Sequence, residues 1–84
     1  MPDWSRFVPA DIEYDFESDK LAEHGIEFEE AVECFFADEF VVRRNKRYRD
    51  RYQWIARTSA GRLLKLVIQL KHNSVVRIIT GWPE

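Results

Sequence analysis

The chain lacks the residues that mark disulfide-bonded, zinc-binding or membrane proteins. It has one cysteine, Cys34, so no internal disulfide can form, and no cysteine cluster suggests a zinc site. Its longest apolar runs are far too short to span a bilayer. The N-terminal stretch has acids but no apolar run, which argues against a signal peptide. With no repeats and no low-complexity tract, residues 1–84 are expected to form a single cytoplasmic domain without metal or cofactor.

Each half of the chain also nearly lacks charge of one sign. Residues 1–40 carry thirteen acids and two bases, whereas residues 41–84 carry eleven bases and two acids. Such asymmetry favours a charged partner, and nucleic acid is the usual one for a basic half. The pI of about 5.7 weakens this interpretation, because a dedicated nucleic-acid binder is usually basic overall. The alternative is that the two halves neutralise each other inside one fold.

Two helices are expected in the acidic half. Asp15 is a plausible N-cap of a first helix that stops before Gly25, which suits a left-handed C-terminal position. The second helix is predicted from the apolar residues Phe28, Ala31, Val32 and Phe35, which recur at i, i+3, i+4 and i+7. We interpret this stripe as core packing, with Cys34 as a small buried filler and not a nucleophile.

The remainder of the chain has the alternation of β-strands. Residues 1–10 are an expected irregular lead, pinned by Trp4 or Phe7. Strands are predicted near Ile12–Tyr14, Phe40–Val42, Arg51–Arg57, Arg62–Lys71 and Val75–Trp82. Turns are expected at 58–61 and 71–74, where glycine and asparagine accept the left-handed region. The order of elements predicts an α+β fold of two layers, with the N-terminal strand and both helices packed on one face of an antiparallel β-meander.

Alternation sorts the strand residues into two faces. The face expected to meet the helices is apolar: Tyr52, Trp54, Ala56, Leu64, Leu66, Ile68, Leu70, Val76, Ile78 and Trp82. The opposite face is expected to carry amides and cations but no acid: Arg51, Gln53, Arg57, Lys65, Gln69, Lys71 and Arg77. Because neighbouring cations repel one another, this face favours an anionic ligand such as RNA. The alternative is an ordinary solvated surface.

The run from Arg43 to Arg49 is a second basic element. It includes Arg47 and Arg49, and Tyr48 is available for base stacking together with Tyr52. A solvated loop, or a complement to the acidic helix face, explains the run equally well.

RNA cleavage requires a group that takes a proton from a 2′-hydroxyl and a cation that stabilises charge on phosphorus. Arginine suits the role of the cation because it stays charged and binds phosphate with two nitrogens. The two histidines are the candidates for the proton acceptor, with His24 at the end of the first helix and His72 at a hairpin tip. A structural or incidental role is the simpler interpretation of each.

Three segments carry motifs. The first is His24-Gly25-Ile26-Glu27-Phe28-Glu29-Glu30-Ala31, followed by Phe35 and Asp38; the others are Arg57-Thr58-Ser59-Ala60-Gly61-Arg62-Leu63-Leu64 and Arg77-Ile78-Ile79-Thr80. The first segment resembles the signature of the BrnT-type toxins of bacterial toxin–antitoxin pairs, K-H-G-V-x-F-E-E-A with F-x-D a few residues later. The other two resemble that family's G-R-x-x-x-G-R-x-L and R-I-I-S, so the resemblance covers residues 12–80.

The resemblance implies a RelE-like fold and a metal-independent ribonuclease that inhibits translation. It also implies a ribbon-helix-helix antitoxin that masks the toxin and binds operator DNA, so that DNA is met only through the antitoxin. By motif position, the expected catalytic residues are Arg57, Arg77 and His24. The expected RNA-binding residues are Arg47, Arg49, Arg51, Arg62, Lys65 and Lys71, and no metal ligand is expected.

The sequence also departs from the family pattern. The family's W-D-P-x-K appears only as Tyr14-Asp15, Glu23 replaces the lysine before His24, and the printed sequence ends at Glu84 where the family continues into a helix. This expected truncation leaves two alternatives to an active ribonuclease. One is a non-catalytic domain of the same fold that binds an acidic protein or the antitoxin. The other is a homo-oligomer, such as a homodimer, in which the acidic layer of one copy meets the basic layer of the next.

Overall fold

The computed structural model describes Trp4 and residues 7–84. The elements in chain order are β1 (Asp11–Tyr14), α1 (Lys20–Glu23), α2 (Phe28–Phe35), β2 (Phe40–Arg44), β3 (Arg51–Arg57), β4 (Leu63–Leu70) and β5 (Val75–Pro83), with a short 3₁₀ helix at His72–Ser74. The five strands form one sheet in the order β1-β5-β4-β3-β2. Strands β2 to β5 are antiparallel neighbours, and β1 pairs with β5 in parallel. The predicted two-layer α+β class is confirmed. The N-terminal strand does not pack with the helices on one face of the meander, as predicted, but pairs with β5 at one edge and makes the sheet mixed.

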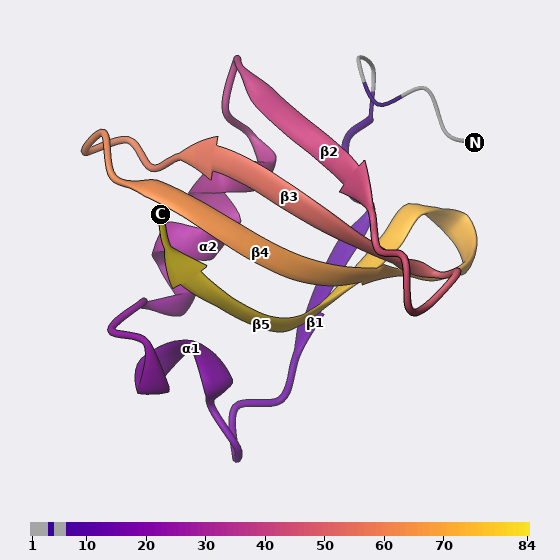
Figure 1. Ribbon diagram of the computed structural model, residues 1–84, viewed down its shortest axis with the longest axis horizontal. Helices are drawn as coiled ribbons and strands as arrows, with labels where there is room; N and C mark the ends of the chain where they lie inside the picture. Colours follow the sequence, from indigo (N-terminus) through magenta and orange to yellow (C-terminus); the bar gives the residue numbers. More distant parts are fainter. Residues whose placement is uncertain (1–3, 5–6) are drawn as a thin grey trace.

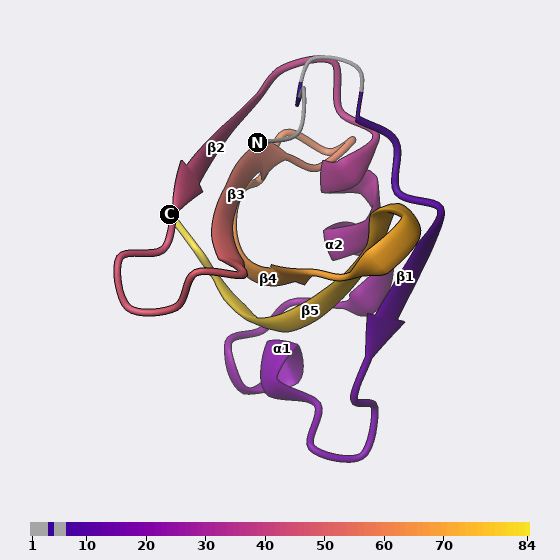
Figure 2. The ribbon, with the colours of Figure 1, turned by 90° about the vertical axis from the view of Figure 1, so that its right-hand side faces the viewer.

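The helices and the sheet make two layers around one core. Figure 1 shows α2 behind β3 and β4 and α1 beside β5, and in Figure 2 the sheet curves around α2. Trp54 of β3 is fully buried at the centre, stacked on Phe40 with 4.3 Å between ring centroids. Its indole N–H donates to the carbonyl of Cys34 in α2 at 2.8 Å, so a hydrogen bond joins the two layers. No helix in the described part of the chain is long and apolar enough to cross a bilayer.

The two helices differ in how well the sequence predicted them. Helix α2 lies where the apolar stripe predicted a helix, and the Glu30 carboxylate accepts from the backbone N–H of Glu27 at its start. The first helix is much shorter than predicted, because Asp15 accepts from two backbone N–H groups of a turn instead of capping a helix. Asp19 is the N-cap of α1, and its carboxylate also accepts from the Tyr14 hydroxyl at 2.6 Å.

The strands lie where alternation placed them, within a residue or two. The residues expected to face the helices are buried, except that Leu70 and Trp82, each near the end of its strand, are half-buried. Gly61 (φ 88°) and Asn73 (φ 58°) take the left-handed conformation in the two turns, as predicted. Residues 1–3 and 5–6 of the expected irregular lead lie outside the described residues. Trp4 and Phe7 pack against Trp54, so the lead is pinned as expected.

Trp82 lies on the opposite face from the one predicted. The register between β4 and β5 changes so that Ile68 pairs with Ile78 but Val67 pairs with Thr80. One residue of β5, Ile79, is therefore a bulge, and each later residue changes face because side chains alternate along a strand. Trp82 consequently pairs with Lys65 on the face turned away from α2.

Gly81 occupies the core-facing position that was predicted for Trp82. A methyl group on Gly81 would come within 2.7 Å of Leu66 Cδ2 and 3.2 Å of Leu21 Cδ2. This close approach lets Leu21 of α1 pack directly on β5, and Leu21 is fully buried there. The bulge therefore places Trp82 on the open side of the sheet. It also places Gly81 where α1 can pack closely against β5.

Candidate functional site

We call the face of the sheet turned away from α2 the open face. The strand register places these side chains on it: Asp11, Glu13, Val41, Arg43, Arg51, Gln53, Ile55, Arg57, Leu63, Lys65, Val67, Gln69, Val75, Arg77, Thr80 and Trp82. Arg57, Lys65 and Arg77 thus lie on one side of the molecule. The prediction for this face named only amides and cations. Its centre is more apolar than that, because Val67 is buried and Ile55 is half-buried.

The open face is not free of acids, and the prediction that it would be was wrong. Glu13 arrives on β1, which was not assigned to this face from sequence, and its carboxylate accepts from Lys71 Nζ at 2.8 Å and lies 3.7 Å from Arg77. Asp50 accepts from the Gln69 amide at 2.7 Å. Glu84 lies 3.7 Å from Lys65. Part of the positive charge is therefore compensated within the chain.

The cations around Glu13 favour the ionised form of its carboxyl group. The hydrogen bond from Lys71 is the main reason that the pKa of Glu13 lies below its ordinary value, and the charges of Lys71 and Arg77 act in the same direction. At neutral pH the carboxylate is ionised and holds both cations at the edge formed by β1 and β5.

At the other end of the open face, Lys65 and His24 approach the indole ring of Trp82. Lys65 Nζ lies 5.9 Å from the centroid of the Trp82 ring, and the His24 ring lies 6.2 Å from the same centroid. Arg57 is opposite Leu63, two residues before Lys65 on β4. Such diagonal neighbours on adjacent strands are about 7–8 Å apart, within reach of long side chains. We call Arg57, Lys65, Trp82 and His24 the Trp82 cluster.

The four members come from separate parts of the chain. His24 is the C-cap of α1, which the contact between Leu21 and β5 places beside Trp82. The Arg57 side chain is exposed and donates to the carbonyl of Gly61 in its own hairpin at 2.8 Å. The cluster therefore has an imidazole and an ammonium group near an aromatic surface, with a guanidinium on the next strand.

A wide hollow of about 910 Å³ opens on the other side of Arg57. Its floor is apolar, with Phe36 at the end of α2, Val41 and Ile55. Its rim also carries carboxylates of Glu33, Asp38 and Glu39. These acids repel phosphate, so a polyanion that contacts Arg57 is directed away from the hollow and toward Lys65.

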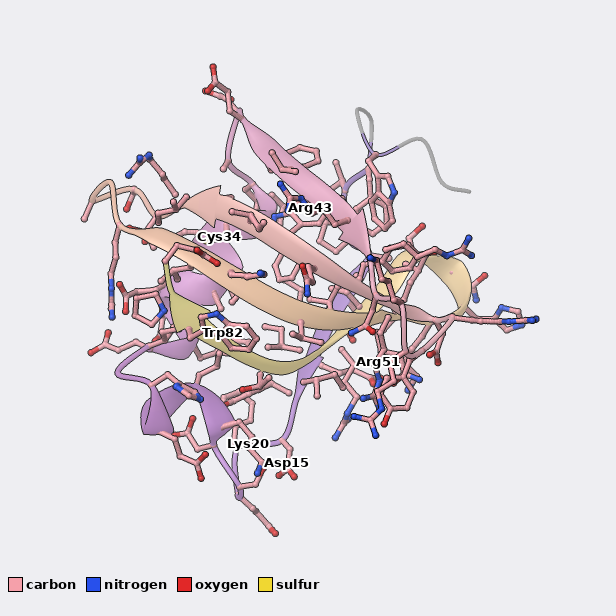
Figure 3. The ribbon with its side chains drawn as sticks, viewed as in Figure 1. Asp15, Lys20, Cys34, Arg43, Arg51 and Trp82 are labelled. Atoms are coloured by element: carbon pink, nitrogen blue, oxygen red, sulfur yellow. The ribbon has the colours of Figure 1, made fainter. Side chains whose placement is uncertain are left out.

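The remaining predicted residues gather at the far end of the strands. The Arg51 guanidinium lies over the Tyr48 ring, 4.2 Å from its centroid, and Arg47 reaches the same ring at 5.9 Å. Arg51 Nε is buried without a hydrogen-bond partner among the described residues. Arg49 is exposed in the same loop. Figure 3 shows Arg51 and Trp82 toward opposite ends of the sheet.

Arg57 and Arg77 are far apart although they share the open face. Arg57 pairs with Leu63 and Arg77 with Gln69, so six residues of β4 separate them. At about 3.3 Å per residue this is roughly 20 Å, too far for both arginines to hold one phosphate. Arg57 lies toward the same end of the open face as Lys65 and Trp82, whereas Arg77 lies with Lys71 beside Glu13 toward the other end.

Arg62 points to the helix layer. Its guanidinium donates to the carbonyl of Gly25 at 2.9 Å and to the Glu30 carboxylate at 3.1 and 3.2 Å. It thereby joins the start of β4 to the connection between the two helices. Its position in the motif is consistent with this structural role.

Cys34 is buried as predicted. Its thiol lies 3.7 Å from the carbonyl of Ala56, and burial raises its pKa to about 11. The thiol is therefore protonated at neutral pH and takes no part in chemistry at the surface.

Sequence reasoning missed Trp82 and Glu13 as members of the open face. No local signal marks the bulge at Ile79, because Arg77-Ile78-Ile79-Thr80 reads as regular strand. Glu13 was missed because the pairing of β1 with β5 links residues far apart in the chain. In the part of the chain that the structure describes, no group of three or more histidine, cysteine, aspartate and glutamate side chains is placed to hold a metal ion.

Fold and site together define a small α+β domain whose helices cover one side of a curved sheet and whose other side presents arginine and lysine. The chain matches the family described as the ribonuclease toxin, BrnT, of type II toxin–antitoxin systems, over residues 15–81. It therefore belongs to that family, as its motifs indicated. Membership implies an RNA substrate and an antitoxin partner. A search of curated proteins found no match to the chain.

Proposed function

We propose that this protein cleaves RNA on the open face, at the Trp82 cluster, without a metal ion. The observation that carries the proposal is the approach of Lys65 and His24 to the Trp82 ring, with Arg57 as the diagonal neighbour of Lys65. These residues supply the groups that metal-independent cleavage of RNA requires: a cation for the phosphate, a group that transfers protons and a surface for a base.

Each residue has a distinct role in this proposal. Trp82 stacks against a base next to the scissile bond. Arg57 donates two hydrogen bonds to the phosphate, and Lys65 adds a second positive charge as negative charge builds up on the phosphoryl oxygens. The 2′-oxygen attacks phosphorus, the bond to the 5′-oxygen breaks, and the products are a 2′,3′-cyclic phosphate and a 5′-hydroxyl. Two protons move in this step, one from the 2′-hydroxyl and one to the leaving 5′-oxygen. His24 transfers one of them and water transfers the other.

Arg77 has a binding role in this scheme instead of a catalytic one. It lies roughly 20 Å along the strands from Arg57 and shares Glu13 with Lys71. Together with Arg51 and the exposed Arg47 and Arg49, these cations guide the RNA strand across the open face. The aromatic ring of Tyr48 offers a second stacking surface at this end.

The antitoxin is proposed to cover the same face. The resemblance implies a ribbon-helix-helix protein that binds operator DNA, so this toxin reaches DNA only as part of the complex. Covering the open face blocks RNA from the Trp82 cluster and thus explains neutralisation by simple competition.

One observation favours a second candidate function. Glu13, Asp50 and Glu84 already occupy cationic and amide groups of the open face. Groups of the open face thus already contact carboxylates, so a non-catalytic domain that binds an acidic protein would use the same groups. This candidate predicts tight, salt-sensitive binding of an acidic partner without any loss of RNA.

The experiment uses the full chain with a defined single-stranded RNA, with and without excess EDTA, and separately with a cell extract that translates, to which no EDTA is added because ribosomes require Mg²⁺. We expect cleavage that persists in EDTA and yields 2′,3′-cyclic phosphate ends, and no cleavage of the same RNA with a 2′-deoxy nucleotide at the cleaved position. Loss of cleavage in EDTA would refute the metal-independent mechanism. Intact RNA both alone and in the translating extract would refute the ribonuclease proposal and favour the binding domain.

A further inference from the structure

We propose that two copies of this chain pair through the outer edge of β2 to form a symmetric dimer. Strand β2 is last in the sheet order β1-β5-β4-β3-β2. Of the residues that the structure describes, none pairs with its outer edge. Figures 1 and 2 show β2 at the border of the sheet. An unpaired edge is a template for another strand, and the sequence here fits a second copy of itself.

Acidic residues lie at the start of β2 and arginines lie at its end. The segment reads Asp38-Glu39-Phe40-Val41-Val42-Arg43-Arg44. Ion pairs in the described part of the chain involve Glu13, Glu30, Arg62, Lys65, Lys71, Arg77 and Glu84, and thus none of the four charged residues of this segment. An antiparallel partner with the same sequence would bring the acids of one copy to the arginines of the other.

Backbone hydrogen bonding indicates which residues face outward. The Asn45 N–H donates to the Arg51 carbonyl at 3.0 Å, which marks this as a hydrogen-bonded pair between the strands. Hydrogen-bonded and non-hydrogen-bonded pairs alternate along an antiparallel ladder. Phe40, Val42 and Arg44 therefore direct their N–H and C=O groups toward the outer edge.

These constraints select one register. With Val41 opposite Val41 of the second copy, Phe40 and Val42 form hydrogen-bonded pairs from their outward groups. Glu39 then lies opposite Arg43 and Asp38 opposite Arg44, each pair occurring twice because of the two-fold axis. Centring on Val42 also satisfies the backbone but places Val41 opposite Arg43 and Phe40 opposite Arg44, so charge decides against it.

Exposure of apolar surface supports the same edge. Val41 is 49% exposed in the single chain, and it lies at the centre of the proposed register. Arg43, which Figure 3 labels on β2, shares the open face with Val41. Pairing continues the sheet across both copies and puts the two open faces on the same side. Because one short strand per chain buries little area, we expect a weak dimer that needs micromolar or higher protein concentration.

The test measures molar mass by sedimentation velocity with the full chain at about 5–300 µM, a range that spans weak association. We expect a concentration-dependent dimer. Glu39→Arg and Arg43→Glu should each raise the dissociation constant about tenfold or more, because two attractive pairs become repulsive. Glu17→Arg makes the same change of charge beyond β1, at the opposite edge of the sheet, and should leave the dissociation constant within about twofold, as expected for an exposed charge away from the interface.

Mixing supplies the sharper result. The Glu39→Arg and Arg43→Glu chains should dimerise with each other more tightly than either does alone, since every cross-strand pair is again of opposite sign. The double variant E39R/R43E should recover dimerisation by itself. A monomer at every concentration would overturn the proposal, and so would a dimer that neither single substitution weakens. Failure of the mixed pair to associate would overturn the Val41-centred register on which the proposal rests.

Discussion

Replacing Arg57 and Arg62 one at a time by alanine tests whether the open face carries the chemistry. Both arginines belong to the same family motif, and they are five residues apart in sequence. In the structure their side chains serve different layers. Arg57 lies on the open face beside Lys65, whereas Arg62 binds the helix layer through Gly25 and Glu30.

The two substitutions should therefore affect different quantities. Arg62→Ala removes hydrogen bonds to a carbonyl and a carboxylate, in a pair that is partly exposed, with side chains 36% and 23% accessible. We expect a loss of about 1–2 kcal/mol in the free energy of unfolding, discounted for solvent screening. For a domain of this size each kcal/mol lowers Tm by roughly 4–8 °C. Arg57→Ala removes one exposed hydrogen bond and should cost less than about 1 kcal/mol.

RNA cleavage should be reduced more by Arg57→Ala than by Arg62→Ala, the reverse of the order expected for stability. Removal of a cation that stabilises charge on the transition state typically lowers kcat by about 10²–10³. We expect this loss for Arg57→Ala and a much smaller one for Arg62→Ala, once the rate is divided by the fraction folded. Arg57→Lys should recover part of the activity, because it keeps the charge but loses the bidentate geometry.

The assay follows cleavage of a fluorescent RNA together with the circular-dichroism melting curve of each variant. A larger loss of corrected activity in Arg62→Ala than in Arg57→Ala would refute the assignment of the open face. Equal Tm values for the two variants would refute the structural role of Arg62.

Two further predictions concern the core and the β1 edge. Trp54→Phe should destabilise the fold by about 2–4 kcal/mol in urea unfolding, because it leaves the Cys34 carbonyl without its 2.8 Å partner and opens space beside Phe40; a loss below about 0.5 kcal/mol would contradict the packing described. Glu13 has a lowered pKa in the folded state, so its contribution to stability is present above its unfolded pKa and declines as pH falls through the folded value. Glu13→Gln should thus be less stable than the parent at pH 7, with the difference shrinking below about pH 4.5; a difference that is constant with pH would rule out the proposed pairing with Lys71.

The first helix shows why one element could not be predicted from the sequence. Asp15 and Gly25 were read as the two ends of one helix, but Asp15 holds a turn and Asp19 caps four residues. Both aspartates are good N-caps, and the choice between them depends on Tyr14, whose hydroxyl donates to Asp19. That contact requires β1 to be paired in the sheet.

The composition of the open face was predicted only in part, again because it depends on contacts between distant segments. Alternation within each strand correctly separated Arg57 and Lys65 from the core positions. It did not reveal that β1 pairs with β5 and brings Glu13 against Arg77, nor that a bulge at Ile79 reverses the end of β5. Pairing between distant strands and a change of register are properties of two segments, so neither is encoded in the periodicity of one.

The amino-acid sequence by itself determined the family, the position and buried stripe of α2, the strands within a residue or two and the buried face of β3 and β4. These follow from local periods of 3.6 and 2 and from contiguous motifs, which need no knowledge of the neighbouring segments. Only the tertiary structure decided that Lys65 and His24 approach the Trp82 ring at one end of the open face, with Arg57 as the diagonal neighbour of Lys65, and that Arg77 lies toward the other end. Position along a strand pair is set by register, and register is fixed by which side chains the whole core can bury together.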